Sequence, residues 1–245
     1  MKSPRPPRYL EAGSMNLSPD ILLFIPVLLL CLTVHEFAHA WAANKGGDMT
    51  ATYHGRLTLN PIAHIDPIGT VLMPIIALLA SGIPMICWAK PVPVNTMRLR
   101  SSIWHVYVSL AGPASNILLL LATVAVAKVV LMAGGEAAQT ALVQAFQGAG
   151  TGPLGIFFDI AQKMILMNLV LAIFNMIPIP PLDGSSLVYH FFVRERWHLH
   201  GAWAALSQFG FIILFVLIQI PLFRQGLAAA YSIPYYHINL WLAGV

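Results

Sequence analysis

The chain has 245 residues, of which 58% are hydrophobic and 9% are charged, and its mean hydropathy is +0.75. Soluble domains carry about 25% charged residues, so this composition excludes a soluble protein and indicates a single polytopic membrane domain. The net charge of +4 comes from basic residues that are scattered through loops. This distribution is typical of membrane flanks and does not suggest a nucleic-acid partner.

The first apolar stretch, 21–43, follows a polar, proline-rich N-terminal tail of residues 1–20, in which Met15 is an alternative start. It contains 23 residues. As a helix it reaches roughly 35 Å, which is enough to cross a hydrocarbon core of about 30 Å. We therefore predict a membrane-spanning helix, and it carries His35, Glu36 and His39.

The His–Glu–x–x–His spacing of this helix places His35 and His39 one turn apart on one face, where both imidazoles can bind one metal ion. Glu36 lies beside them and can take a proton from a water molecule on that metal. The alternative is a pair of histidines at a helix end that face the lipid headgroups. Ionisable groups are costly in an apolar segment, and 21–34 holds no charge, so the sequence favours a metal site.

The region between the first and second clear spans has a different pattern. Residues 49–60 contain β-branched residues, alternation and a central Gly55, which predict a short β-ribbon at the membrane surface. The apolar stretch 68–88 is interrupted by glycines and prolines. It predicts either a full span or a broken, re-entrant segment buried against protein. Residues 89–95 are rich in proline and should be extended.

The second half of the chain predicts further membrane helices, so that the fold is an all-α polytopic membrane protein with about four to six spans. The apolar segments are 103–133, 160–177 and 202–222. Residues 134–158 lack Lys and Arg and are interpreted as a Gly/Ala-rich loop. The membrane domain is thus expected to cover 21–223, with an interfacial C-terminal tail at 224–245.

A hydrolytic zinc site needs three protein ligands and one open position. Most acidic residues lie in loops or at segment ends, whereas Asp183 lies in PIPPLDG between two apolar stretches. Broken backbone at membrane depth is tolerated where it lines a protein cavity, so Asp183 is the best candidate for a third ligand. The alternative is an aspartate in an interfacial turn before Gly184.

Two motifs together resemble the site-2 protease family of intramembrane zinc metalloproteases. They are HEFAH at 35–39 and N-x-x-P-x-P-P-L-D-G at 175–184, and AGPASN at 111–116 resembles the core helix of that family. The resemblance covers 21–189 and implies one Zn²⁺ per chain, bound by His35, His39 and Asp183. It also implies Glu36 as the catalytic base and Asn175 as a group that holds the substrate or the oxyanion. No segment resembles a PDZ or CBS domain, so the chain is similar to the compact branch of the family.

The resemblance also implies a topology. In this family the two ligand-bearing helices run the same way with one crossing between them, and the site lies nearer the cytoplasm. This favours the re-entrant reading of 68–88 and makes 44–102 and 185–200 cytoplasmic, in agreement with their basic residues. If 68–88 is a full span and the N-terminus lies inside the cell, the distribution of Lys and Arg agrees with the positive-inside rule about as well. The implied protein is a multi-pass protein of a bacterial plasma membrane that cuts membrane proteins or transmembrane peptides; its oligomeric state is not predicted.

Several interpretations stay open. His64 and Asp66 could gate the site or hold a ligand imidazole from behind, or they could form an interfacial turn. The 49–60 ribbon could bind an unwound substrate by strand addition. Cys31, one turn before His35, could approach the metal or serve as an apolar filler. The rival functions are a zinc transporter, which would need further polar ligands on several spans, and an inactive homologue that binds membrane proteins, against which the intact Glu36 argues.

Overall fold

The computed structural model describes residues 19–73, 76 and 88–244. Within these residues the regular structure is helical, with no β-strand. The main helices are α1 (Pro19–Lys45), α2 (Thr50–Tyr53), α4 (Ile103–Phe146), α5 (Gly152–Asn175), α6 (Gly184–Val188), α7 (His200–Gln219) and α8 (Pro221–Ala243). Shorter 3₁₀ or π turns are η2 (Pro61–His64), η3 (Pro67–Leu72), η4 (Thr96–Arg98), η5 (Tyr189–Val193) and η6 (Trp197–Leu199).

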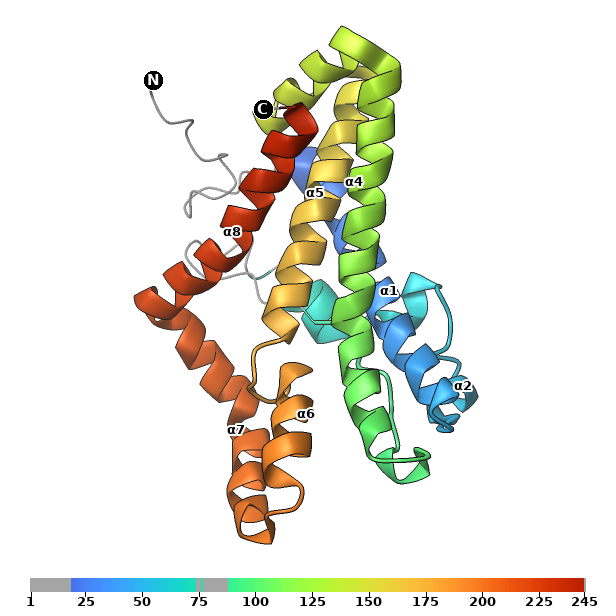
Figure 1. Cartoon of the computed structure of the whole chain (residues 1–245), viewed down its shortest axis with the longest axis vertical. Coiled ribbons are helices and arrows are strands. Elements are labelled where there is room, and N and C mark those ends of the chain that lie inside the picture. The colour runs from blue at the N-terminus through green and yellow to red at the C-terminus, as the bar shows by residue number, and fades with distance from the viewer. Residues whose placement is uncertain (1–18, 74–75, 77–87, 245) are drawn as a thin grey trace.

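Four helical segments are long and apolar enough to cross a membrane: Leu23–Lys45, Ile103–Phe146, Gly152–Asn175 and Trp197–Gln219. They confirm the prediction of an all-α polytopic membrane protein. Helices α1, α4 and α5 pack together as the centre of the bundle. In Figure 1, α1 and α5 run in the same direction, and α4 runs in the opposite direction. The shared direction of α1 and α5 agrees with what the resemblance implied for the two ligand-bearing helices.

The long helix α4 corrects the prediction of a loop at 134–158. Gly135 has a φ of 54° and a ψ of −137°, which breaks the helix at a conformation that favours glycine. The helix then resumes and continues to Phe146 because this part is rich in alanine, the strongest helix former. Ala138, Ala141 and Ala145 are buried in the same apolar cluster as Phe158 of α5. The connection between α4 and α5 is therefore only residues 147–151.

The predicted β-ribbon at 49–60 is wrong, because this segment begins with the helical turn α2. The carboxylate of Asp48 accepts hydrogen bonds from the Thr50 amide at 3.0 Å and from the Thr50 hydroxyl, which starts the turn. The guanidinium of Arg56 is buried and donates to the Lys90 carbonyl, so the segment folds onto a neighbouring loop instead of pairing as a strand. Residues 49–60 therefore offer no strand to which an unwound substrate could be added.

Asp48 also joins this turn to the segment before α4, because its Oδ2 accepts the Asn95 amide at 2.6 Å. Burial raises the pKa of this carboxyl. The hydrogen bonds from Thr50 and Asn95, together with the charge of Arg98, outweigh burial and lower the pKa below its ordinary value. The ionised carboxylate of Asp48 therefore joins these two segments at the end of the bundle where α1 ends.

The stretch 68–88 lies mostly outside the described residues, which leave out 74–75 and 77–87. Its two described flanks are joined, because the Trp88 amide donates to the Gly69 carbonyl at 3.4 Å and the Thr70 hydroxyl donates to the Trp88 carbonyl at 2.8 Å. Both flanks thus lie at the same level of the bundle. The tail 1–18, including Met15, is also outside the described part of the chain.

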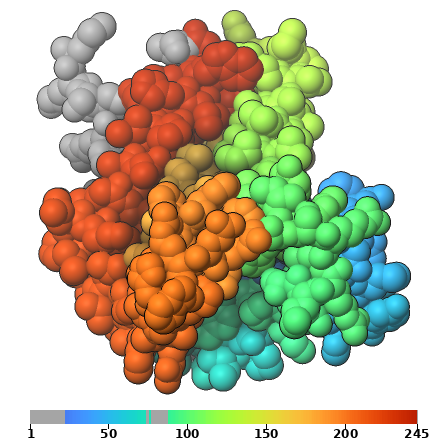
Figure 2. Space-filling view, turned by 60° about the horizontal axis from the view of Figure 1, so that its bottom comes forward, coloured from blue at the N-terminus to red at the C-terminus, as the bar shows by residue number. Residues whose placement is uncertain are grey.

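One end of the bundle collects the segments that connect α1 to α4 and α5 to α7. Figure 2 looks onto this end, where the start of α4, residues 184–200 and the η2–η3 segment are all visible. The connection at 147–151 lies at the opposite end (Figure 1). At that opposite end, Lys128 of α4 donates to the carbonyls of Trp241 and Leu242 at 3.1 and 3.3 Å, which fixes the last turn of α8. The C-terminal tail is thus a helix, and its place at the membrane interface stays a prediction.

Candidate metal centre

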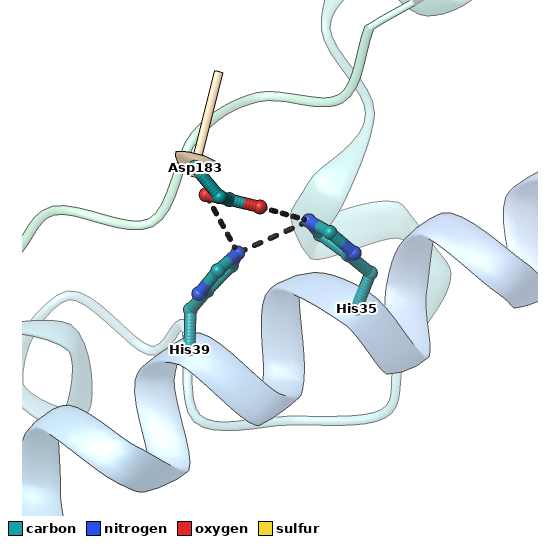
Figure 3. Close-up of side chains that lie close together, drawn as sticks. All are labelled: His35, His39 and Asp183. Carbon is teal, nitrogen blue, oxygen red and sulfur yellow. Dashed lines mark hydrogen bonds and ion pairs between the residues drawn. The ribbon is translucent and has the colours of Figure 1, made fainter. Parts of the chain in front are cut away.

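The two histidines of α1 and the aspartate between α5 and α6 come together in the structure (Figure 3). His35 Nε2 lies 3.0 Å from His39 Nε2 and 3.2 Å from Asp183 Oδ2. His39 Nε2 lies 3.4 Å from Asp183 Oδ1. Both histidines are buried, at 4% and 8% exposure. Asp183, which lies at least 144 positions from either histidine in the sequence, therefore forms one compact group with them, with the donor atoms facing inward.

The local sequence around Asp183 explains how the aspartate reaches the histidines. Helix α5 ends at Asn175, and the prolines of the following PIPP segment prevent the helix from continuing. The chain then folds back so closely that a Cβ at Gly184 would lie 2.6 Å from the Met176 carbonyl carbon. Gly210 of α7 approaches the same loop, because a Cβ there would lie 2.7 Å from the Pro180 carbonyl carbon. Glycine at these two positions allows the loop to hold Asp183 beside α1.

Helix α4 supports both imidazoles from behind. His39 Nδ1 donates to the Val108 carbonyl at 2.7 Å, so the lone pair of His39 lies on Nε2. His35 Nδ1 lies 2.6 Å from Asn116 Oδ1. Between these two contacts, Gly112 lets the helix pass directly under the rings, since a Cβ at Gly112 would lie 2.6 Å from His35 Cε1. Both Nε2 atoms are therefore turned toward Asp183.

The spacing and chemistry of this group fit a zinc ion. Ligands bound tetrahedrally to zinc at about 2.0–2.1 Å lie about 3.3 Å from one another. The three separations here are 3.0, 3.2 and 3.4 Å. Asp183 Oδ2 is buried and has no hydrogen-bond donor among the described residues. Two imidazole nitrogens and a carboxylate oxygen that converge in this way repel each other unless a cation or a proton lies between them.

Glu36 and Asn175, the other two residues predicted for the site, make different contacts. Glu36 Oε2 accepts the Val92 amide at 2.9 Å, so the irregular segment before η4 crosses α1 at this point. Asn175 Nδ2 donates to the Leu171 carbonyl of its own helix at 2.9 Å. Their roles in catalysis stay predictions. The hydrogen bond to Val92 joins residues 56 positions apart, so no local sequence pattern predicts it.

His64 and Asp66 are not brought to the metal-binding group in the described contacts. His64 is buried, with Nε2 at 2.9 Å from the Thr58 carbonyl and Nδ1 at 3.5 Å from the Arg56 guanidinium. Asp66 Oδ1 accepts the amides of Ile68 and Gly69 at 3.0 and 2.7 Å and so caps η3. In the described structure, the groups behind the candidate ligand imidazoles are Asn116 and the Val108 carbonyl instead. The signal for Asn116 was present in the sequence as an amide inside an apolar helix.

Comparisons with known proteins agree with this geometry. Residues 23–217 match the family model described as "Peptidase family M50". The chain is 40% identical over 212 residues to the "Putative zinc metalloprotease YwhC" of Bacillus subtilis (strain 168), which covers 85% of this chain and 84% of the relative. It is 30% identical over 200 residues to the "Putative zinc metalloprotease Rip2" of Mycolicibacterium smegmatis, covering 82% of this chain and 68% of the relative. No solved structure matches the chain significantly.

Proposed function

Since this chain belongs to peptidase family M50, the site-2 protease family, we propose that it hydrolyses peptide bonds in or near the transmembrane segments of other membrane proteins. The chain is a metalloprotease with a zinc cofactor and several membrane-spanning helices. The observation that carries the proposal is the group of His35, His39 and Asp183 inside the helix bundle. A site built on membrane-spanning helices acts on bonds that lie in or next to the membrane.

The proposed zinc ligands are His35 Nε2, His39 Nε2 and one oxygen of Asp183. Their separations of 3.0–3.4 Å support this assignment, as does the buried Oδ2 of Asp183. These three ligands leave a fourth position open, as in catalytic zinc sites. When bound, zinc polarises water and the peptide carbonyl and so supplies both activated water and stabilisation of the oxyanion.

Glu36 is the proposed general base. It follows His35 directly on α1, and its Oε2 is held by the Val92 amide at 2.9 Å, which leaves the other oxygen to take a proton. Glu36 takes a proton from the water molecule as the water oxygen bonds to the peptide carbonyl carbon. The carbon–nitrogen bond then breaks, and the same proton passes from Glu36 to the leaving nitrogen. The products are a carboxyl and an amine, with no net change at Glu36.

Asn175 is the proposed donor to the oxyanion. A side-chain amide has two N–H groups, and one of them donates to the Leu171 carbonyl at 2.9 Å. The second N–H can donate to the negative oxygen that develops during attack, which is where a fixed donor lowers the barrier most. The position of Asn175 at the last turn of α5, just before the loop of Asp183, supports this role.

The proposed active site faces the cytoplasm of a bacterial cell. The segments at the metal-binding end of the bundle contain most of the basic residues outside the tail: Lys45, Arg56, Lys90, Arg98, Arg100, Arg194 and Arg196. The connection at the opposite end, 147–151, contains none. Cytoplasmic loops carry an excess of Lys and Arg, so this asymmetry supports a cytoplasmic position for the metal-binding end.

The test is cleavage of a model transmembrane substrate in detergent by the wild type, Glu36→Gln and Glu136→Gln. Glu136 is exposed on the far part of α4, so its variant controls for the loss of one carboxylate. We expect the wild type and Glu136→Gln to bind one zinc and cut, and Glu36→Gln to bind one zinc without cutting. Cleavage by Glu36→Gln at the wild-type rate would refute the role of the base. A zinc-bound wild type that cuts none of several transmembrane substrates would refute the proposed substrate class.

A further inference from the structure

We propose that two buried asparagines, Asn116 of α4 and Asn168 of α5, position the imidazole of His35 so that its Nε2 lone pair faces the zinc site. This inference rests on the proposed assignment of His35 as a zinc ligand. Both asparagines have 0% exposure, and neither belongs to the ligand set or to the proposed acid–base chemistry. They connect the metal-binding helix α1 to the two helices packed against it.

The contacts form one continuous path. Asn168 Nδ2 donates to the Met164 carbonyl at 2.9 Å and contacts Cys31 Sγ at 3.2 Å. Asn116 Nδ2 donates to Asn168 Oδ1 at 2.8 Å and to the Cys31 carbonyl at 3.3 Å. Asn116 Oδ1 then lies 2.6 Å from His35 Nδ1. The path therefore runs from the backbone of α5 to the ring of His35.

The direction of every hydrogen bond in this path is determined by backbone carbonyls, which can only accept. The Met164 carbonyl requires the nitrogen of Asn168 on its side, so the oxygen of Asn168 faces Asn116. That oxygen and the Cys31 carbonyl both require the nitrogen of Asn116. The oxygen of Asn116 must then face His35, and the hydrogen of the neutral imidazole must lie on Nδ1. The Nε2 atom keeps its lone pair, which is the state that a metal ligand needs.

Burial excludes other hydrogen-bonding arrangements of these two amides. Cys31 is also at 0% exposure, so water does not compete for the amides or offer them other partners. Reversing either amide would place two acceptors or two donors against each other in an apolar environment. Cys31 itself contacts the amide of Asn168 through its sulfur and is absent from the metal-binding group. Cys31 therefore lies beside this hydrogen-bonded path, and its buried side chain fills space between α1 and α5.

Asparagine in a membrane helix can also serve only to join helices, and a pair of variants separates the two roles. Asn116→Asp and Asn116→Leu both lose the donors to Asn168 and to the Cys31 carbonyl. Only Asn116→Asp keeps an acceptor for His35 Nδ1. A purely structural role would weaken both variants alike, whereas a positioning role would preserve zinc binding in Asn116→Asp.

The experiment measures the zinc affinity of the purified, detergent-solubilised chain by competition with a chromogenic chelator. Loss of the group that orients a metal-bound histidine typically costs about 10- to 100-fold in affinity, and we expect this loss for Asn116→Leu. Asn116→Asp should stay within about 3-fold of the wild type, and Asn168→Leu should lie between them, since the Cys31 carbonyl still orients Asn116. Thr123→Val is the matched control, because it removes a side-chain hydrogen bond to the Leu119 carbonyl elsewhere on α4.

Equal zinc affinities for Asn116→Leu and Asn116→Asp would overturn the proposal. Thermal unfolding of the zinc-free forms shows whether each variant is folded, and Asn116→Ala replaces Asn116→Leu in the comparison if the latter does not fold. His35→Ala separates this inference from the proposed function. If His35→Ala loses zinc and Asn116→Leu does not, the positioning role alone fails. If His35→Ala binds zinc as the wild type does, the ligand assignment fails, and the positioning role fails with it.

Discussion

Substitution of Gly112 by alanine gives the sharpest test of how α4 shapes the metal centre. A Cβ at this position would lie 2.6 Å from His35 Cε1 and 2.7 Å from His35 Nε2, and closer still to His39 Nε2. Ordinary van der Waals contact begins at 3.4 Å. The rings of both histidines, or the helix that carries them, would therefore have to move by at least about 0.8 Å, against a tolerance of about 0.2 Å for metal–ligand distances.

The effect of Gly112→Ala should appear in zinc binding and not in helix stability. Alanine is the better helix former by about 1 kcal/mol, so the change would stabilise an ordinary helical site. A displacement approaching 1 Å at a reactive centre costs about 100-fold, and we expect at least this loss in zinc affinity and in cleavage rate. The control is Gly226→Ala in α8, where a Cβ meets nothing within 4 Å. That variant should bind zinc normally and unfold at the same temperature or a higher one.

The assay is chelator competition for zinc, followed by cleavage of the transmembrane substrate at saturating zinc. A Gly112→Ala protein that binds zinc and cuts as the wild type does would refute the reasoning. It would mean that the two rings can shift away from α4 without losing the geometry that the metal needs.

Two further predictions concern the parts that hold the site in place. Gly210→Ala should push α7 away from the Pro180 carbonyl, which should cost about 1–3 kcal/mol of stability and lower the activity. Thermal unfolding and substrate cleavage measure these effects, and Gly201→Ala is the control because a Cβ there meets nothing within 4 Å. An unchanged melting temperature for Gly210→Ala would contradict the prediction. For Asp48, the folded pKa is below its ordinary value of 3.8, so its stabilising effect is complete above that value and disappears as the pH falls through the folded pKa. Asp48→Asn should therefore be less stable than the wild type at neutral pH, with a difference that shrinks below pH 3.8; a difference independent of pH would count against this account.

The candidate metal-binding residues could be identified from the sequence because their signals are local. His35 and His39 are four residues apart, and the 3.6-residue period of a helix places them on one face wherever that helix lies. Asp183 was the best candidate for a third ligand because it lies in a proline-rich break between apolar stretches, and broken backbone at membrane depth is tolerated where it lines a protein cavity. The apolar composition of the spans likewise predicted a helical membrane bundle without any knowledge of its packing.

Other features were decided by contacts between distant segments. The alternation in 49–60 is typical of a strand, but the carboxylate of Asp48 starts a helical turn at Thr50, and Arg56 is drawn to the Lys90 carbonyl. Residues 134–158 appeared to be a loop because of their glycines, yet the alanines after Gly135 form a helix once α5 offers an apolar surface. Local preference is weak in such segments, so tertiary packing determines their structure.

The surroundings of the metal centre also depended on the tertiary structure alone. Asn116 lies 81 positions from His35, and Val92 lies 56 positions from Glu36, so no periodicity within a helix relates them. What places them together is the crossing of α4 and the preceding segment over α1, which Gly112 permits by its lack of a side chain. The sequence by itself determined which groups can bind a metal in the membrane. The packing of α1, α4 and α5 decided which groups hold those ligands and in which orientation, because hydrogen bonds across helices depend on how close the backbones approach.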